Sequence, residues 1–153
     1  MKPLNKVIIN KDTSFNPIWI MRQAGRYLPE FREIRKKNSD FISLCLNDDL
    51  SSEITLQPIK RFDLDAAIIF SDILMLPYGL GQKVEFEKNF GPKLGELNLN
   101  EIAKTDEIDF VEKIHRVYKA IKKVSSDQTL KDKNTIGFVG APWTLLVLSL
   151  IHI

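Results

Sequence analysis

Arg22 and Arg26 flank a short turn at Gly25 near the start of the chain. A guanidinium group stays charged near neutral pH and holds a carboxylate or phosphate through two parallel hydrogen bonds. Two such groups around one turn predict a site for a ligand with more than one anionic group. The alternative is that the arginines pair with surface acids such as Glu30 and Glu33, and residue type alone does not decide between these interpretations.

A carboxylate follows the most apolar stretch of the chain. Residues 66–70 contain no polar side chain, and Ser71 and Asp72 come directly after them. A carboxylate at the end of a buried strand is partly desolvated and needs N–H donors from arginines, the backbone or a ligand. Asp72 is therefore a second candidate binding residue. The alternative is that Asp72 caps a short helix beginning at Ile73.

Composition narrows the function classes. The 153 residues are 44% hydrophobic and 27% charged, which is typical of one globular domain. The net charge of +2 gives no general support to a nucleic-acid partner. The single cysteine, Cys45, forms no intrachain disulfide and has no His or second Cys at metal-binding spacing, and His115 is expected at the surface or boundary of its helix. We expect a cytoplasmic protein without metal or cofactor.

No membrane segment is expected. The N-terminal residues lack the apolar core of a signal peptide. The apolar run from Ile136 to Ile153 is long enough to span a bilayer, but Gly137, Gly140 and Pro142 interrupt it. We therefore expect a strand, a turn and a helix in this run.

Apolar stretches alternate with helical patterns along the chain. We expect buried parallel strands at Ile18–Met21, Asp65–Phe70 and Thr135–Val139, a short strand at Gln82–Glu87 and a loop at Asn89–Leu97. Helices are expected from Pro29, at Phe41–Leu46, from Asp48, from a cap at Thr105 and from Trp143.

This alternation predicts an α/β fold with parallel strands, either an open doubly wound sheet or a (β/α)₈ barrel. In both folds the functional residues gather at the carboxyl ends of the strands. The arginine turn (residues 22–26), Asp72 and Gly140–Trp143 all follow predicted strands. We therefore expect a single site at one end of the sheet.

Three motifs in order, MRQAGRYLPEFREIR (residues 21–35), LDAAIIFSDIL (64–74) and GFVGAPWTL (137–145), resemble the uroporphyrinogen decarboxylase family. The resemblance covers nearly all of the chain. It implies a (β/α)₈ barrel, of which residues 1–153 form a single incomplete domain with roughly three β/α units. It also implies cofactor-independent decarboxylation of the four acetate side chains of uroporphyrinogen III to coproporphyrinogen III, and a homodimer at full length.

The resemblance also implies roles for particular residues. Asp72 would receive the pyrrole N–H groups and stabilise the positive charge on the protonated ring as carbon dioxide leaves. An arginine bound to the reacting acetate would oppose the loss of its negative charge. The arginines would therefore hold non-reacting carboxylates, or one would donate a proton, so that Asp72 and Arg22 are the catalytic candidates. The substrate-binding candidates are Arg22, Gln23, Ala24, Gly25, Arg26, Arg35 and Asp72.

The sequence departs from the family in its last part. A complete barrel needs about 250 residues, and Leu148 stands where the family tyrosine is expected. Residues 148–153 match a translated transposase adapter end, so we expect them to be non-native, and we expect no decarboxylation by this fragment alone. Two other interpretations stay open here, a barrel methyltransferase acting on corrinoid-bound methyl groups and a non-catalytic tetrapyrrole-binding fragment.

Overall fold

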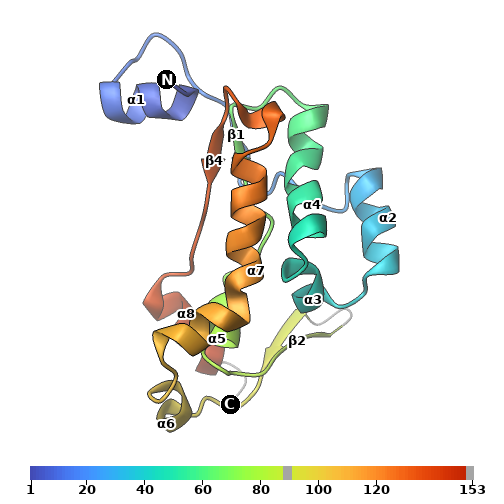
Figure 1. Cartoon of the computed structure of the whole chain (residues 1–153), viewed down its shortest axis with the longest axis vertical. Coiled ribbons are helices and arrows are strands. Elements are labelled where there is room, and N and C mark those ends of the chain that lie inside the picture. Colours follow the sequence, from blue (N-terminus) through green and yellow to red (C-terminus); the bar gives the residue numbers. More distant parts are fainter. Residues whose placement is uncertain (88–90, 151–153) are drawn as a thin grey trace.

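The computed structural model describes residues 1–87 and 91–150 (Figure 1). Residues 89–90, part of the expected loop, and residues 151–153, part of the segment expected to be non-native, lie outside the described residues. The elements in chain order are α1 (Pro3–Asn10), α2 (Pro29–Lys37), α3 (Phe41–Cys45), α4 (Asp48–Arg61), β1 (Ala66–Ile68), α5 (Met75–Gly79), β2 (Val84–Glu87), β3 (Gly91–Leu94), α6 (Leu99–Ile102), α7 (Glu107–Ser125), the 3-10 helix η1 (Gln128–Leu130), β4 (Asn134–Ile136) and α8 (Pro142–Leu150).

The strands form two small sheets. β1 and β4 pair in parallel, with Ala66 opposite Asn134 and Ile68 opposite Ile136. β2 and β3 pair antiparallel. The mixed α/β class is confirmed, but the described ranges contain two parallel strands instead of three and no closed barrel.

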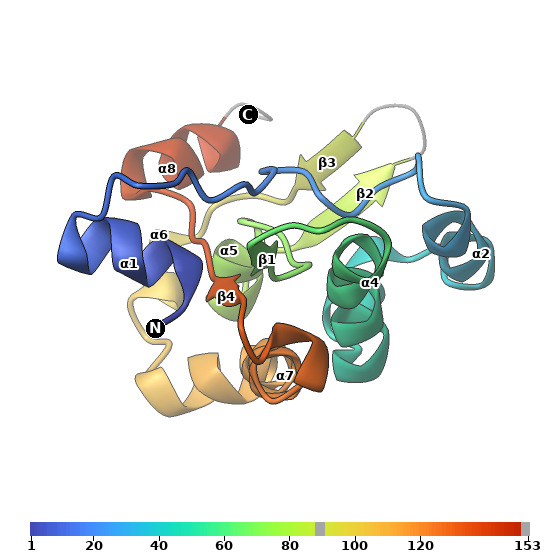
Figure 2. The same ribbon diagram turned by 90° about the horizontal axis from the view of Figure 1, so that it is seen from above.

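Helices α4 and α7 cover one side of the β1–β4 pair. They pack against each other along much of their length (Figure 1), and the view in Figure 2 places both on the same side of the strands. The segment from α1 to α2 crosses the opposite side (Figure 2). The core between the helices and the strands consists of Leu56, Ile59, Leu64, Ala67, Ile69, Val124 and Leu130.

An ion cluster joins α4 to α7. The Asp48 carboxylate, only 8% exposed, lies 2.5 Å from Lys123 Nζ and 2.7 Å from Arg116 Nη1. These two cations hold the pKa of Asp48 well below its usual range. Helix α7 itself is the long amphipathic helix predicted from the sequence, although its N-cap is Asp106 and not Thr105.

The expected strand at Ile18–Met21 is wrong. These residues form no regular element, and their side chains are exposed, from 39% for Trp19 to 74% for Met21. Two hydrogen bonds join Ile18 to the residue before β1: Asp65 N donates to Ile18 O at 2.8 Å, and Ile18 N donates to Asp65 Oδ2 at 2.7 Å. An apolar run becomes a buried parallel strand only when layers cover both of its faces, and the exposure of residues 18–21 shows that the described residues do not cover this segment in that way.

The other differences concern strand ends and short elements, among them the unpredicted helix α6 and the 3-10 helix η1. β1 and β4 are three residues each, shorter than the predicted stretches. β3 lies within the expected loop, and helix α1 was not predicted. The side-chain amide of Asn134 binds α1, accepting from Leu4 N at 2.9 Å and donating to Asn5 Oδ1 at 2.8 Å. The N-terminal helix therefore docks at the start of β4.

Candidate functional site

A cavity of about 620 Å³ lies at the carboxyl ends of β1 and β4. It brings Arg22, Gln23 and Ala24 of the arginine turn together with Asp72. Asp72 follows β1, as expected for a functional residue at a strand end, whereas no strand precedes the arginine turn in the described part of the chain. Gly25, Arg26, Arg35 and Gly140–Trp143 do not line it. The full lining is Trp19, Met21, Arg22, Gln23, Ala24, Ile68, Ile69, Phe70, Ser71, Asp72, Ile73, Ile136 and Phe138.

Gln23 ties the arginine turn to β1. Its side chain is 2% exposed, and Nε2 donates to Ala66 O at 2.6 Å while Oε1 accepts from Ile68 N at 2.9 Å. The amide thus occupies the two backbone groups on the free edge of β1, where a neighbouring strand would bind. Sequence reasoning named Gln23 as a substrate contact and missed this role, because its partners lie far along the chain.

The two guanidinium groups of the turn are unpaired. Across residues 1–87 and 91–150, the side chains of Arg22 and Arg26 take part in no hydrogen bond or ion pair. Their alternative partners are engaged elsewhere: Glu30 accepts from Arg61 Nε and Nη2 at 3.0 and 2.9 Å, and Glu33 pairs with Lys36 at 2.6 Å. Pairing of the two arginines with Glu30 or Glu33 is thus absent from the described residues, and ligand binding by Arg22 and Arg26 stays a prediction.

Gly25 lies in the turn without needing a glycine-specific conformation. Its carbonyl accepts from Leu28 N at 3.0 Å, and its φ is not among the positive values found for other glycines. A Cβ at this position would lie 3.6 Å from the ring of Tyr27, an ordinary contact. The backbone conformation therefore does not require a glycine in this turn, and substrate binding by Gly25 stays a prediction.

Arg35 lies in a different environment from the cavity arginine. Its Nη1 donates to Asn38 O at 2.8 Å and to Ser39 O at 3.1 Å. Its guanidinium carbon lies 5.5 Å from the centroid of the Phe41 ring. This side chain closes the loop between α2 and α3, so its substrate contact stays a prediction.

Among the described residues, one carboxylate oxygen of Asp72 accepts a hydrogen bond and the other accepts none. Oδ1 accepts from Leu74 N at 2.8 Å, and the Asp72 carbonyl accepts from Met75 N at 3.1 Å. Asp72 thus closes the turn before α5 and does not cap that helix, whose N-cap is Leu74 without a side-chain cap bond, while Oδ2 has no hydrogen-bond partner among the described residues. Burial raises the pKa of this carboxyl, against the smaller opposing effect of the Leu74 N–H. A ligand N–H group or cation would offset that desolvation.

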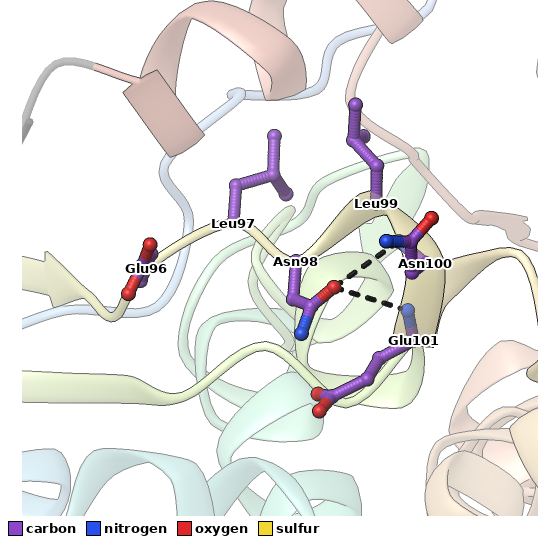
Figure 3. Close-up of a pocket in the computed structure, with 6 residues that line it drawn as sticks. All are labelled: Glu96, Leu97, Asn98, Leu99, Asn100 and Glu101. Carbon is purple, nitrogen blue, oxygen red and sulfur yellow. Dashed lines mark hydrogen bonds between the residues drawn. The ribbon is translucent and has the colours of Figure 1, made fainter.

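A second hollow, formed by residues 96–101, offers less chemistry (Figure 3). Its converging bonds are those of a helix cap, since Asn98 Oδ1 accepts from Asn100 N and Glu101 N at 3.1 and 3.3 Å. It contains none of the predicted site residues. Over the part of the chain described, no three His, Cys, Asp or Glu side chains gather to hold a metal. No helix in that part is both long and apolar enough to cross a membrane.

Comparisons with known proteins agree with the three sequence motifs. The family model "Uroporphyrinogen decarboxylase (URO-D)" matches residues 1–151. A uroporphyrinogen decarboxylase of Chelativorans sp. (strain BNC1) is 48% identical over 129 residues, which are 84% of this chain and 37% of the relative. The Agrobacterium fabrum protein of that name is 46% identical over 140 residues, 91% of this chain and 40% of the relative. The Rickettsia felis protein of that name is 45% identical over 144 residues, which are 92% of this chain and 41% of the relative.

The chain thus spans about two fifths of the length of these curated relatives. The match runs through the arginine turn, through Asp72 and through the exit of β4, the three parts that border or adjoin the cavity. With the family model matched over nearly the whole chain, the chain belongs to the uroporphyrinogen decarboxylase family.

Proposed function

We propose that the complete protein to which this chain belongs decarboxylates the four acetate side chains of uroporphyrinogen III, giving coproporphyrinogen III without a cofactor. The observation that carries this proposal is the meeting of Asp72 and Arg22 in one mainly apolar cavity, where Asp72 Oδ2 and the Arg22 guanidinium have no partner among the described residues. A substrate with carboxylates at its rim and pyrrole N–H groups at its centre needs both kinds of partner.

Asp72 has the properties needed to stabilise the transition state. Protonation of a pyrrole carbon makes the ring cationic, the bond to the carboxylate carbon breaks, and its electron pair passes into the ring as carbon dioxide leaves. A carboxylate near the ring nitrogens interacts more strongly with the cationic ring than with the neutral ring of the ground state, so it stabilises the transition state. Because Asp72 is partly desolvated, the attraction is stronger than it would be in water.

The arginines have a different task. Negative charge leaves the reacting acetate, so a guanidinium fixed on that group would favour the ground state over the transition state. We propose that Arg22 and Arg26 hold the non-reacting carboxylates, with Arg22 nearest the ring as the proton-donor candidate. Arg35 would contribute to substrate binding, either by closing the loop between α2 and α3 or by binding a substrate carboxylate further from the ring.

The larger architecture is part of the same proposal. We propose that the parallel β1–β4 pair belongs to a (β/α)₈ barrel in a homodimer located in the cytoplasm. Support for the barrel comes from helices on one side of the strands and from exposed apolar residues such as Ile20, Phe138 and Val139, which further strands could cover. The dimer and the compartment rest on the family resemblance and on the single cysteine.

A chimera tests the activity. Residues 1–147 of this chain would be joined to the downstream remainder of the Agrobacterium fabrum relative, and coproporphyrinogen formation would be measured by chromatography. We expect turnover, and we expect Asp72→Asn to lower kcat by about 10²–10³-fold with much weaker effect on substrate binding. A folded chimera without turnover, beside an active relative, would refute the activity. Equal losses of kcat and binding in Asp72→Asn would refute the role of Asp72.

The alternative of a corrinoid methyltransferase has less support. The relatives reported above carry the name uroporphyrinogen decarboxylase, and the arginine turn is present in full. The non-catalytic alternative predicts binding of a porphyrin polycarboxylate by the chimera without conversion of uroporphyrinogen, so the same assay separates it.

A further inference from the structure

Two hydroxyl groups on α4 hold the backbone of Phe70. Phe70 N donates to Thr55 Oγ1 at 2.8 Å, and Ser51 Oγ donates to Phe70 O at 2.7 Å. Both hydroxyl-bearing residues are buried, Thr55 at 0% and Ser51 at 1% exposed. We call this pair the hydroxyl clamp.

The hydroxyl clamp acts where strand pairing ends. The last bond from β1 to the β4 segment runs from Ile69 N to Ile136 O at 3.1 Å, so Phe70 has no strand partner there. Thr55 Oγ1 also donates to Ser51 O at 2.8 Å, so its single proton is already assigned and the hydroxyl can only accept from Phe70. The clamp therefore fixes the peptide groups on both sides of Phe70.

Asp72 lies between this clamp and a second fixed point. The turn after Asp72 is held by the bonds from Leu74 N and Met75 N to Asp72. Only Ser71 separates the clamped residue from that turn. The direction in which the Asp72 carboxylate enters the cavity is therefore set by two points, one on α4 and one at the start of α5.

We propose that Ser51 and Thr55 are positioning residues of the site, which aim Asp72 into the cavity by holding both backbone polar groups of Phe70. The inference rests on the proposed function insofar as it takes Asp72 as the partner of the pyrrole nitrogens. The Phe70 ring supports the same fixed geometry, since it packs edge-on against Phe31 and Phe41 at centroid distances of 5.9 and 5.8 Å.

Matched substitutions at Thr55 test the proposal in the full 153-residue chain. Thr55→Val keeps the shape and removes the hydroxyl, while Thr55→Ser keeps the hydroxyl. The probes are amide hydrogen exchange at Phe70, the carbon-13 titration of the Asp72 carboxyl, and binding of uroporphyrin III followed by its fluorescence. Ser51→Ala, which removes one bond of the clamp, supplies the same three readouts if Thr55→Val does not fold.

We expect Thr55→Val to speed exchange at Phe70 by about tenfold, the equivalent of one lost buried hydrogen bond. The titration midpoint of Asp72 should move down toward the ordinary Asp value because water gains access, and uroporphyrin binding should weaken. Thr55→Ser should restore all three. Faster exchange at Phe70 with an unchanged Asp72 titration would overturn the proposal, since the clamp would then be structural only.

The outcomes separate this inference from the proposed function. An altered Asp72 titration in Thr55→Val, in a chain that does not bind uroporphyrin III, would support the clamp and count against the tetrapyrrole site. Equal uroporphyrin binding and equal Asp72 titration in the parent chain and in Thr55→Val would count against the clamp and leave the tetrapyrrole site supported.

Discussion

Replacement of Gln23 by leucine tests how the site is attached to the sheet. The Gln23 amide makes two hydrogen bonds to β1, to Ala66 O at 2.6 Å and from Ile68 N at 2.9 Å. Leucine has a similar volume but neither a donor nor an acceptor. The variant therefore leaves both backbone groups without a partner while the packing volume is nearly kept.

The size of the effect follows from the burial of the two backbone groups. Each lost hydrogen bond costs about 1 kcal/mol, and a buried group left unsatisfied costs about 1–3 kcal/mol. Ala66 is 0% exposed and bears the full penalty, while Ile68 is only partly buried, so water can reach it. We expect Gln23→Leu to lower the free energy of unfolding by about 2–4 kcal/mol, which lowers the urea midpoint by about 1–2 M.

A second buried glutamine provides the control. Gln57 is 6% exposed, and its Nε2 and Oε1 have no hydrogen-bond partner among the residues that the structure describes. Gln57→Leu should therefore be neutral or stabilising, because it removes a desolvated amide without breaking a bond. Urea unfolding of both variants, followed by circular dichroism, makes the comparison. Equal midpoint shifts for Gln23→Leu and Gln57→Leu would refute the reasoning.

Three further predictions concern packing and charge. Gly79→Ala should destabilise the fold by about 1–3 kcal/mol, because a Cβ there would lie 2.6 Å from an aromatic ring of α7. Gly25→Ala is the control and should leave the midpoint of thermal unfolding unchanged, since its Cβ would make an ordinary contact. Asp48→Asn should lower the free energy of unfolding at pH 7, because the pKa of Asp48 is lower in the folded than in the unfolded chain. The stabilisation by Asp48 is present above its unfolded pKa of about 4 and is lost progressively as the pH falls below that value. The exposed Asp49→Asn is its control, in urea unfolding at pH 7 and 3. Asp72→Asn should stabilise at pH 7, since burial raises the pKa of this carboxyl and makes ionisation costly, and this gain should vanish below about pH 4, where the carboxyl is protonated in both states.

Elements with a local signal could be predicted from the sequence. Helix α7 follows from apolar residues three and four apart, and β1 lies within the apolar stretch expected to be a strand. The segment 18–21 could not be assigned correctly, because its apolar residues indicate burial while its actual conformation depends on which layers are present to cover it.

The candidate site also combines features that could be predicted from a local sequence signal with features that depend on distant residues. The place of Asp72 at the carboxyl end of β1 could be predicted from the apolar stretch before it. The meeting of Arg22 with Asp72 was also predicted, but from a strand at 18–21 that the structure does not contain. The attachment of Gln23 to β1 and the hydroxyl clamp could not be predicted, because they join side chains to backbone groups 43–45 and 15–19 residues away. Likewise, the freedom of the arginines depends on the pairing of Glu30 with Arg61, 31 residues downstream.

The parallel pairing of β1 with β4 has a consequence for the order of assembly during synthesis. Ala66 pairs with Asn134, so β1 leaves the ribosome long before its strand partner exists. Contacts between such distant residues form slowly, and an open strand edge invites pairing with other nascent chains. Gln23 and α4 are synthesised before or just ahead of β1 and can bind its other edge and its end at once. The emerging chain therefore has to protect only one edge of β1 until residues 134–136 arrive.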